Sequence, residues 1–157
     1  MEATINPDHI TVKVENLSRR YGETLAVSQV NFECHKGEVL GFLGPNGAGK
    51  STSMQMITGN LAPTTGQITI NGYDLIDQPI EAKSCIGYLP EHPPLYRDLT
   101  VDEYLTYCAR LHRIARAQIK AAVDDVKQHC GLEQVGQRLI GNLSKGYQQR
   151  VGIAQAI

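Results

Sequence analysis

Residues 44–52 read Gly44-Pro45-Asn46-Gly47-Ala48-Gly49-Lys50-Ser51-Thr52 and constrain the chain more than any other stretch. They match the pattern G-x-x-x-x-G-K-[ST]. Glycines at this spacing let the backbone curl so that successive N–H groups point at one anion. A helix that starts at the end of the loop adds unpaired N–H groups and the positive end of its dipole. The stretch therefore predicts a phosphate-binding loop.

The flanking sequence supports this prediction. The apolar run at 38–43 predicts a short strand before the loop, and residues 51–58 predict a helix after it. In this setting, Lys50 would bring a mobile positive charge to the β- and γ-phosphates of a nucleotide. The hydroxyl of Ser51 would ligate Mg²⁺. The alternative is a glycine-rich turn that matches by chance, which the base rate of glycine makes rare.

Length and composition narrow the class of protein. The chain has 157 residues, the size of one domain, and 41% of them are hydrophobic, enough for a core. The formal net charge of −1 gives no electrostatic sign of a nucleic-acid partner. No apolar run reaches the length of a membrane span, and the N-terminus lacks the features of a signal peptide. The four cysteines and five histidines show no metal-binding spacing. We expect a cytoplasmic protein, or the cytoplasmic subunit of a larger assembly.

The first part of the chain has the periodicity of strands. Alternating apolar and polar residues predict strands at 10–16, 25–33 and 67–70. The last of these ends at Asn71-Gly72, a strong signal for a tight turn.

After Pro90 the pattern becomes helical. Thr100 and Glu103 form a capping box in front of an apolar stripe of helical spacing. A second stripe is closed by Gly131, and a third helix is expected to start after Ser144 and continue to the chain end.

Residues 143–151 connect these elements to a known family. They read Leu143-Ser144-Lys145-Gly146-Tyr147-Gln148-Gln149-Arg150-Val151. This stretch resembles the signature motif L-S-G-G-Q of ABC-type ATPases and lies at the spacing from Lys50 that is typical of the family. Residues 87–91 resemble the Q-loop of the family, and Tyr21 stands where the family has an adenine-stacking aromatic residue. The residues of these motifs are most similar to those of ATPase subunits of bacterial ABC-2 type exporters, including the gliding-motility kind.

The resemblance implies an α/β fold, the P-loop NTPase fold of the ABC-type nucleotide-binding domain, with a RecA-like core, an antiparallel β subdomain and a helical subdomain. It divides the chain into a β subdomain with the phosphate-loop core at 8–90, a helical subdomain at 91–145 and the start of the signature helix at 144–157. The family continues with an apolar strand that ends in Asp-Glu, which residues 1–157 do not contain. We therefore interpret the chain as a single incomplete domain, truncated before this Walker B strand.

The resemblance also implies a site for ATP and Mg²⁺. Tyr21 would stack on adenine, and Ser51 and Glu91 would ligate Mg²⁺. Lys50 and Glu91 would contribute to catalysis without forming a complete catalytic set. The remaining nucleotide contacts would come from the phosphate loop and from the signature segment of a second subunit. The expected nucleotide-binding residues are Tyr21, Gly44, Pro45, Asn46, Gly47, Ala48, Gly49, Lys50, Ser51, Thr52, Glu91, Ser144, Lys145 and Gly146.

Three residues depart from the family pattern. Glu91 replaces a glutamine, so it can bind Mg²⁺ but cannot donate a hydrogen bond when it is ionised. Lys145 replaces the first glycine of the signature and puts an ammonium near the expected γ-phosphate. Tyr147 replaces the signature glutamine. All three changes are compatible with the resemblance, but the detailed contacts of the usual motif are not assumed at these positions.

The function implied by the resemblance is that of an ATP-hydrolysing subunit that energises a bacterial membrane exporter. Two subunits, as a homodimer, would enclose ATP, and a transmembrane permease subunit would hold them at the inner face of the plasma membrane. The chain as given is expected to bind ATP without turning it over. Two alternatives remain: a soluble ABC-type ATPase that acts in translation or DNA repair, and a non-hydrolysing nucleotide-binding module.

Overall fold

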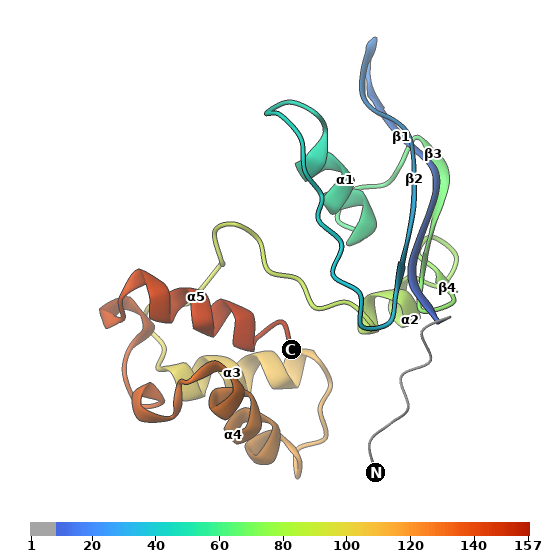
Figure 1. Ribbon diagram of the computed structural model, residues 1–157. Coiled ribbons are helices and arrows are strands. Elements are labelled where there is room, and N and C mark those ends of the chain that lie inside the picture. Colours follow the sequence, from blue (N-terminus) through green and yellow to red (C-terminus); the bar gives the residue numbers. More distant parts are fainter. Residues whose placement is uncertain (1–8) are drawn as a thin grey trace. The chain divides into compact units, whose positions relative to one another are not determined.

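The computed structural model describes residues 9–157 and divides into two compact units. The first ends at Ile86, and the second runs from Gly87 to Ile157 (Figure 1). Among residues 9–157, no helix has both the length and the apolar character needed to cross a membrane.

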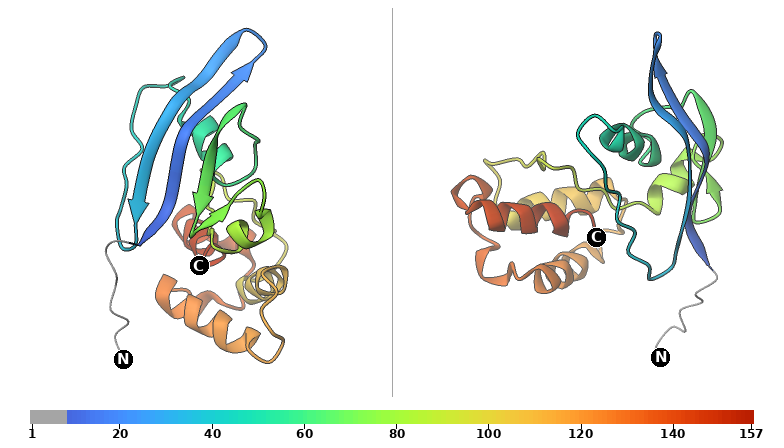
Figure 2. Two further views of the ribbon diagram at one scale, coloured as in Figure 1. Left: turned by 90° about the vertical axis from the view of Figure 1, so that its right-hand side faces the viewer. Right: turned by 45° about the horizontal axis from the view of Figure 1, so that its top comes forward.

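The first unit is built on an antiparallel sheet with the strand order β2-β1-β3-β4. Its strands are β1 (Ile10–Tyr21), β2 (Thr24–His35), β3 (Thr65–Ile70) and β4 (Tyr73–Asp74). The predicted strands are confirmed, and the first two extend beyond their predicted ends into one long hairpin (Figure 2). The predicted turn is confirmed as well: Asn71 and Gly72 both have positive φ, as the tight turn between β3 and β4 requires.

Two helices pack on this sheet. They are α1 (Lys50–Ile57), which confirms the predicted helix after the loop, and α2 (Pro79–Ser84), which was not predicted. Met56 of α1 is fully buried among the inward side chains of the strands. This core consists of Val14, Leu17, Val27, Met56, Ile57, Ile68, Ile70, Leu75 and Ala82. It fixes α1, and with it the end of the loop at 44–49.

The strand predicted at 38–43 is wrong for this structure. These residues belong to no sheet, and Val39 and Leu43 are 96% and 92% exposed. A strand exists only where its N–H and C=O groups pair with a neighbour, and none of the strands within 9–157 pairs with this segment. Phe42 nevertheless anchors it, because its ring packs against Phe32 of β2 at a centroid distance of 5.9 Å.

The second unit is helical, as predicted after Pro90. Its elements are α3 (Val101–Leu111), α4 (Ile119–Cys130), the short 3-10 helices η1 (Glu133–Val135) and η2 (Ile140–Asn142), and α5 (Lys145–Ala154). The capping box of Thr100 and Glu103 is present, and Gly131 ends α4 in the left-handed conformation. Helix α5 begins after Ser144 as expected but ends at Ala154, before the chain end.

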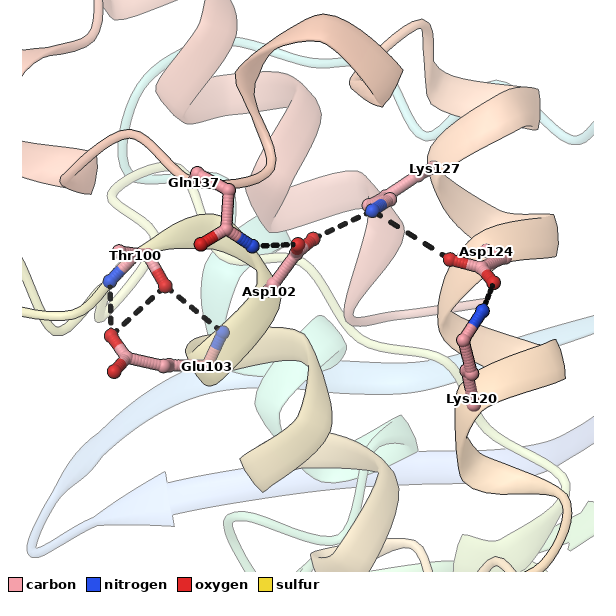
Figure 3. Close-up of polar contacts among 7 residues, drawn as sticks. All are labelled: Thr100, Asp102, Glu103, Lys120, Asp124, Lys127 and Gln137. Atoms are coloured by element: carbon pink, nitrogen blue, oxygen red, sulfur yellow. Dashed lines mark hydrogen bonds and ion pairs between the residues drawn. The ribbon is translucent and has the colours of Figure 1, made fainter.

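A partly buried ion pair joins α3 to α4 (Figure 3). Lys127 of α4 donates to the carboxylate of Asp102 at 2.7 Å, and the Lys127 side chain is only 12% exposed. The amide of Gln137 donates to the other oxygen of Asp102 at 2.7 Å. Both oxygens of the carboxylate therefore accept a hydrogen bond. Because the ion pair is partly buried, removal of Lys127 or of Asp102 would leave the other as a poorly solvated charge.

Candidate functional site

The loop at 44–49 leads into α1 through Gly49, which has φ 82 and ψ 7. An added Cβ at Gly49 would lie 2.5 Å from the carbonyl oxygen of Ala26 and 2.9 Å from Cγ2 of Val27. Only glycine fits here, because a side chain would collide with the backbone of β2 and would also disfavour the left-handed conformation. This close approach fixes the end of the loop against the sheet.

The N-terminus of α1 is open to a ligand. Gly49 offers no side-chain cap, and the first turn contains no acidic residue. The first N–H groups of a helix have no partner within the helix, and they carry the positive end of its dipole. Ser51 in this turn is exposed. The turn can therefore donate to an anion and offer a hydroxyl oxygen beside it.

Lys50 reaches back over the loop. Its Nζ donates to the carbonyl oxygens of Gly44 and Pro45 at 2.6 and 2.7 Å. The N–H of Ala48 donates to the carbonyl of Pro45 at 3.2 Å and closes a turn in the same segment. The ammonium thus sits among the backbone groups that the sequence predicts for phosphate contact, and it has three donors to share.

Mg²⁺ is compatible with these residues. The ion prefers oxygen ligands and usually keeps several waters beside substrate phosphates and one or two protein groups. The exposed hydroxyl of Ser51 can supply one such oxygen. Glu91, the second predicted ligand, is exposed and belongs to the second unit.

Tyr21 lies at the end of β1, opposite Thr24 in the hairpin, and is 48% exposed. The guanidinium carbon of Arg19 lies 4.7 Å from the centroid of its ring. Ala26, which contacts Gly49, lies two residues after Thr24 on β2. Two residues of a strand span about 7 Å. The structure therefore brings Tyr21 and the loop to the same part of the β1–β2 hairpin, with one ring face against Arg19.

The signature segment lies at the start of α5 in the second unit. Ser144 is the N-cap residue, and its Oγ accepts from the N–H of Tyr147 at 3.4 Å. Lys145 and Gly146 form the exposed first turn, which has no acidic residue. The Nε2 atom of Gln148 donates to the carbonyls of Ile140 and Leu143 at 3.2 and 3.0 Å. These bonds hold the segment before Ser144 against the helix that it caps.

The segment that contains Glu91 is attached to the same helix. The Nε2 atom of Gln155 donates to the carbonyl of Tyr88 at 3.0 Å. Gly152 of α5 lies so close to this segment that an added Cβ would meet Leu89 and Pro93 at 2.8 and 2.9 Å. Glu91 and the signature segment are thus linked through α5.

The predicted residues therefore form two groups. Tyr21 and the phosphate loop belong to the first unit, whereas Glu91 and the signature segment belong to the second. Sequence reasoning missed Arg19 and Gln148. No motif marks Arg19, although its place two residues before Tyr21 on one strand puts both on the same face. The signature stretch contains Gln148, but only the structure shows its bonds to the preceding loop.

Similarity to known proteins shows the family of this chain. A family model described as ABC transporter matches residues 27–157. The chain belongs to the ABC transporter family. Among the ABC proteins it resembles, the ABC transporter ATP-binding protein NatA of Bacillus subtilis is 39% identical over 93% of this chain and 61% of NatA. The bacitracin transport ATP-binding protein BcrA of Bacillus licheniformis is 37% identical over 93% of this chain and 47% of BcrA.

A solved ABC structure shares the fold. CbiO1 of Clostridium perfringens, part of the ABC transporter complex cbiONQ, superposes with a TM-score of 0.84 at 28% identity. The match covers 95% of this chain and 61% of CbiO1. The fold class expected from the motifs is confirmed, apart from the unpaired segment at 38–43. The chain spans about half to three-fifths of the length of these ABC relatives.

Proposed function

We propose that the chain binds Mg-ATP through residues 44–52 and Tyr21, as the nucleotide-binding part of an ATPase subunit that energises a bacterial exporter. The observation that carries this proposal is the position of Lys50 over the loop, beside the open N-terminus of α1. The names of NatA and BcrA, an ABC transporter and a bacitracin transport ATP-binding protein, agree with a role in transport.

Each part of the first unit would have a definite task in binding. The first-turn N–H groups of α1 would donate to phosphate oxygens, and Lys50 would turn from the loop carbonyls toward the β- and γ-phosphates. Tyr21 would stack its free face on adenine, a contact worth about 1–3 kcal/mol. Bound Mg²⁺ would neutralise phosphate charge, with Ser51 as one ligand and Glu91 as a candidate for another.

Calorimetric titration with Mg-ATP tests this proposal. The parent should bind ATP more tightly than inorganic triphosphate, because only ATP offers a base to Tyr21. Equal affinities for the two ligands would rule out the adenine contact. No binding of either ligand would overturn the proposed site altogether.

We also propose that residues 1–157 bind ATP without steady turnover. Hydrolysis in this family needs a positioned water and a complete Mg²⁺ shell. The apolar strand with Asp-Glu that supplies these groups in the family has no counterpart in the sequence 1–157. Phosphate release should equal that of a Lys50→Ala control. Steady release by the parent that disappears in the control would show that other residues supply these groups.

A homodimer and a permease partner complete the proposal. Ser144, Lys145 and Gly146 would face the γ-phosphate of ATP held by a second copy, and the permease would hold the subunits at the inner face of the plasma membrane. The exposed first turn of α5 supports the dimer contact, because it presents N–H donors and an ammonium to an anion.

The dimer contact predicts that ATP promotes self-association in sedimentation experiments. Lys145→Glu should weaken this effect, because it places a carboxylate where phosphate is expected. Arg138→Glu, which makes the same charge change at an exposed position of the second unit, serves as the control. Equal association of both variants and the parent would remove Lys145 from the interface.

A further inference from the structure

Positive charge gathers where α3 is joined to α4. The sequence has no acidic residue between Glu103 and Asp124, although the chain as a whole carries a net charge of −1. This interval contains Arg110, Arg113, Arg116 and Lys120. The interval lies outside both groups of proposed nucleotide contacts.

Two acidic side chains near this interval, Asp124 and Asp102, are engaged in ion pairs (Figure 3). Asp124 accepts from Lys120 at 2.6 Å, and this hydrogen bond, together with the positive charge of Lys120, lowers the pKa of the Asp124 carboxyl. Asp102 is held by Lys127 and Gln137. Lys120 is thereby paired with Asp124, whereas the arginines of the interval have no ion-pair partner among residues 9–157.

Two of these arginines share a surface hollow. Arg110, Ile114, Arg116 and Ile119 line a depression of about 470 Å³. Within residues 9–157, the guanidinium groups of Arg110 and Arg116 make no ion pair and no hydrogen bond. A planar guanidinium fits two phosphate oxygens at once. The hollow thus combines two free phosphate donors with apolar walls.

An exposed apolar side chain follows Arg110 in the sequence. Leu111, next to Arg110, is 63% exposed at the end of α3. Arginines combined with an exposed leucine suit a surface that is anionic outside and apolar beneath, as the headgroup region of a membrane is. A free phosphate ion would use the arginines alone and would leave Leu111 without a role.

We propose that the basic hollow, defined by Arg110, Ile114, Arg116 and Ile119, binds the phosphate headgroup of an anionic phospholipid. Arg110 and Arg116 contact the phosphate, and Leu111 enters the interfacial layer. The inference does not rest on nucleotide binding, because none of these residues belongs to the proposed ATP site. The two proposals can therefore fail separately.

Vesicle flotation with the full 157-residue chain tests this inference. At low salt, the chain should float with vesicles of phosphatidylcholine plus phosphatidylglycerol and not with phosphatidylcholine alone, and added salt should release it. The double variant Arg110→Gln/Arg116→Gln should weaken vesicle binding about 30-fold, since each basic residue near an anionic surface contributes about 5-fold. Leu111→Ser should weaken it to a smaller extent.

The matched control is Arg97→Gln/Arg138→Gln, which removes the same charge from exposed positions of the same unit. It should float like the parent, and circular dichroism should show that both double variants are folded. Equal losses in the two double variants would overturn the proposal, because binding would then follow net charge alone. The lipid assignment would also be overturned if the chain bound inorganic phosphate in calorimetry but did not float with anionic vesicles.

Discussion

The ammonium of Lys50 donates to the main-chain carbonyl oxygen of Gly44 at 2.6 Å, six residues earlier in the chain. This contact folds the Lys50 side chain back onto the start of the loop. Since the side chain also reaches the carbonyl of Pro45, two of its three donors are engaged by the loop itself. A phosphate that enters the loop would therefore meet a charge that is already positioned, but it would have to replace part of this hydrogen bonding.

Replacement of Lys50 tests what the side chain contributes. Lys50→Ala should weaken Mg-ATP binding by about 10-fold or more, because a hydrogen bond to a charged group contributes about 1.5–3 kcal/mol. The fold should persist, since the loop is exposed at 44–48. Calorimetry measures the affinity, and circular dichroism checks the fold. Lys36→Ala removes an exposed charge from the same unit and should bind as the parent does.

Alanine substitutions at Gly49 and Gly47 distinguish the cost of backbone strain from the cost of a steric clash. Both have strongly positive φ, 82 and 84. A Cβ at Gly47 would meet nothing within 4 Å, whereas one at Gly49 would meet the backbone of Ala26. Gly47→Ala should therefore cost about 1–2 kcal/mol of stability through strain alone. Gly49→Ala should cost roughly 1–3 kcal/mol more, since the helix must move away from β2.

Urea unfolding measures both glycine variants. Gly49→Ala should also lose ATP affinity, because the start of α1 shifts with it. Equal stabilities of the two variants would mean that the approach of Gly49 to Ala26 does not hold the loop against the sheet.

Tyr21 is expected to act through its ring and not through its hydroxyl. Tyr21→Ala should cost about 1–3 kcal/mol of ATP affinity, and Tyr21→Phe much less. Arg19→Gln removes the guanidinium that lies 4.7 Å from the ring centroid but keeps the ring, so it should change the affinity less than Tyr21→Ala does. Calorimetry with all three variants decides. A loss in Tyr21→Phe as large as that in Tyr21→Ala would assign the role to the hydroxyl.

Local sequence signals predicted much of this fold. The capping box at Thr100, the left-handed Gly131 and the turn at Asn71 each depend on a few neighbouring residues, and all are confirmed. The segment at 38–43 was predicted wrongly because pairing, unlike periodicity, depends on a partner strand elsewhere in space.

The candidate site shows the same division between local and distant effects. The motif identified the loop, because glycine spacing and Lys50 are features of contiguous sequence. It could not show that Gly49 touches β2 or that Gln148 holds the segment before Ser144. Those contacts join residues through the fold, and no local pattern encodes them.

The capping box of α3 predicts a specific pH dependence. The carboxylate of Glu103 accepts from the N–H and the hydroxyl of Thr100 at 2.8 and 2.9 Å. These bonds favour the ionised form and lower the pKa of Glu103 below its ordinary value of 4.5. A lowered pKa means that this stabilisation is fully present above pH 4.5 and is lost as the pH falls through the lower folded-state pKa.

Glu103→Gln isolates this effect, because glutamine keeps a capping oxygen at the same position but does not titrate. The parent should be more stable than the variant at neutral pH, and the difference should shrink as the pH falls below the ordinary glutamate value of 4.5. Urea unfolding at several pH values, followed by helix circular dichroism, measures the difference. Glu133→Gln, at an exposed glutamate of the same unit, controls for the change in net charge. A difference between parent and Glu103→Gln that stays constant into acid would show that the ionised carboxylate does not stabilise α3.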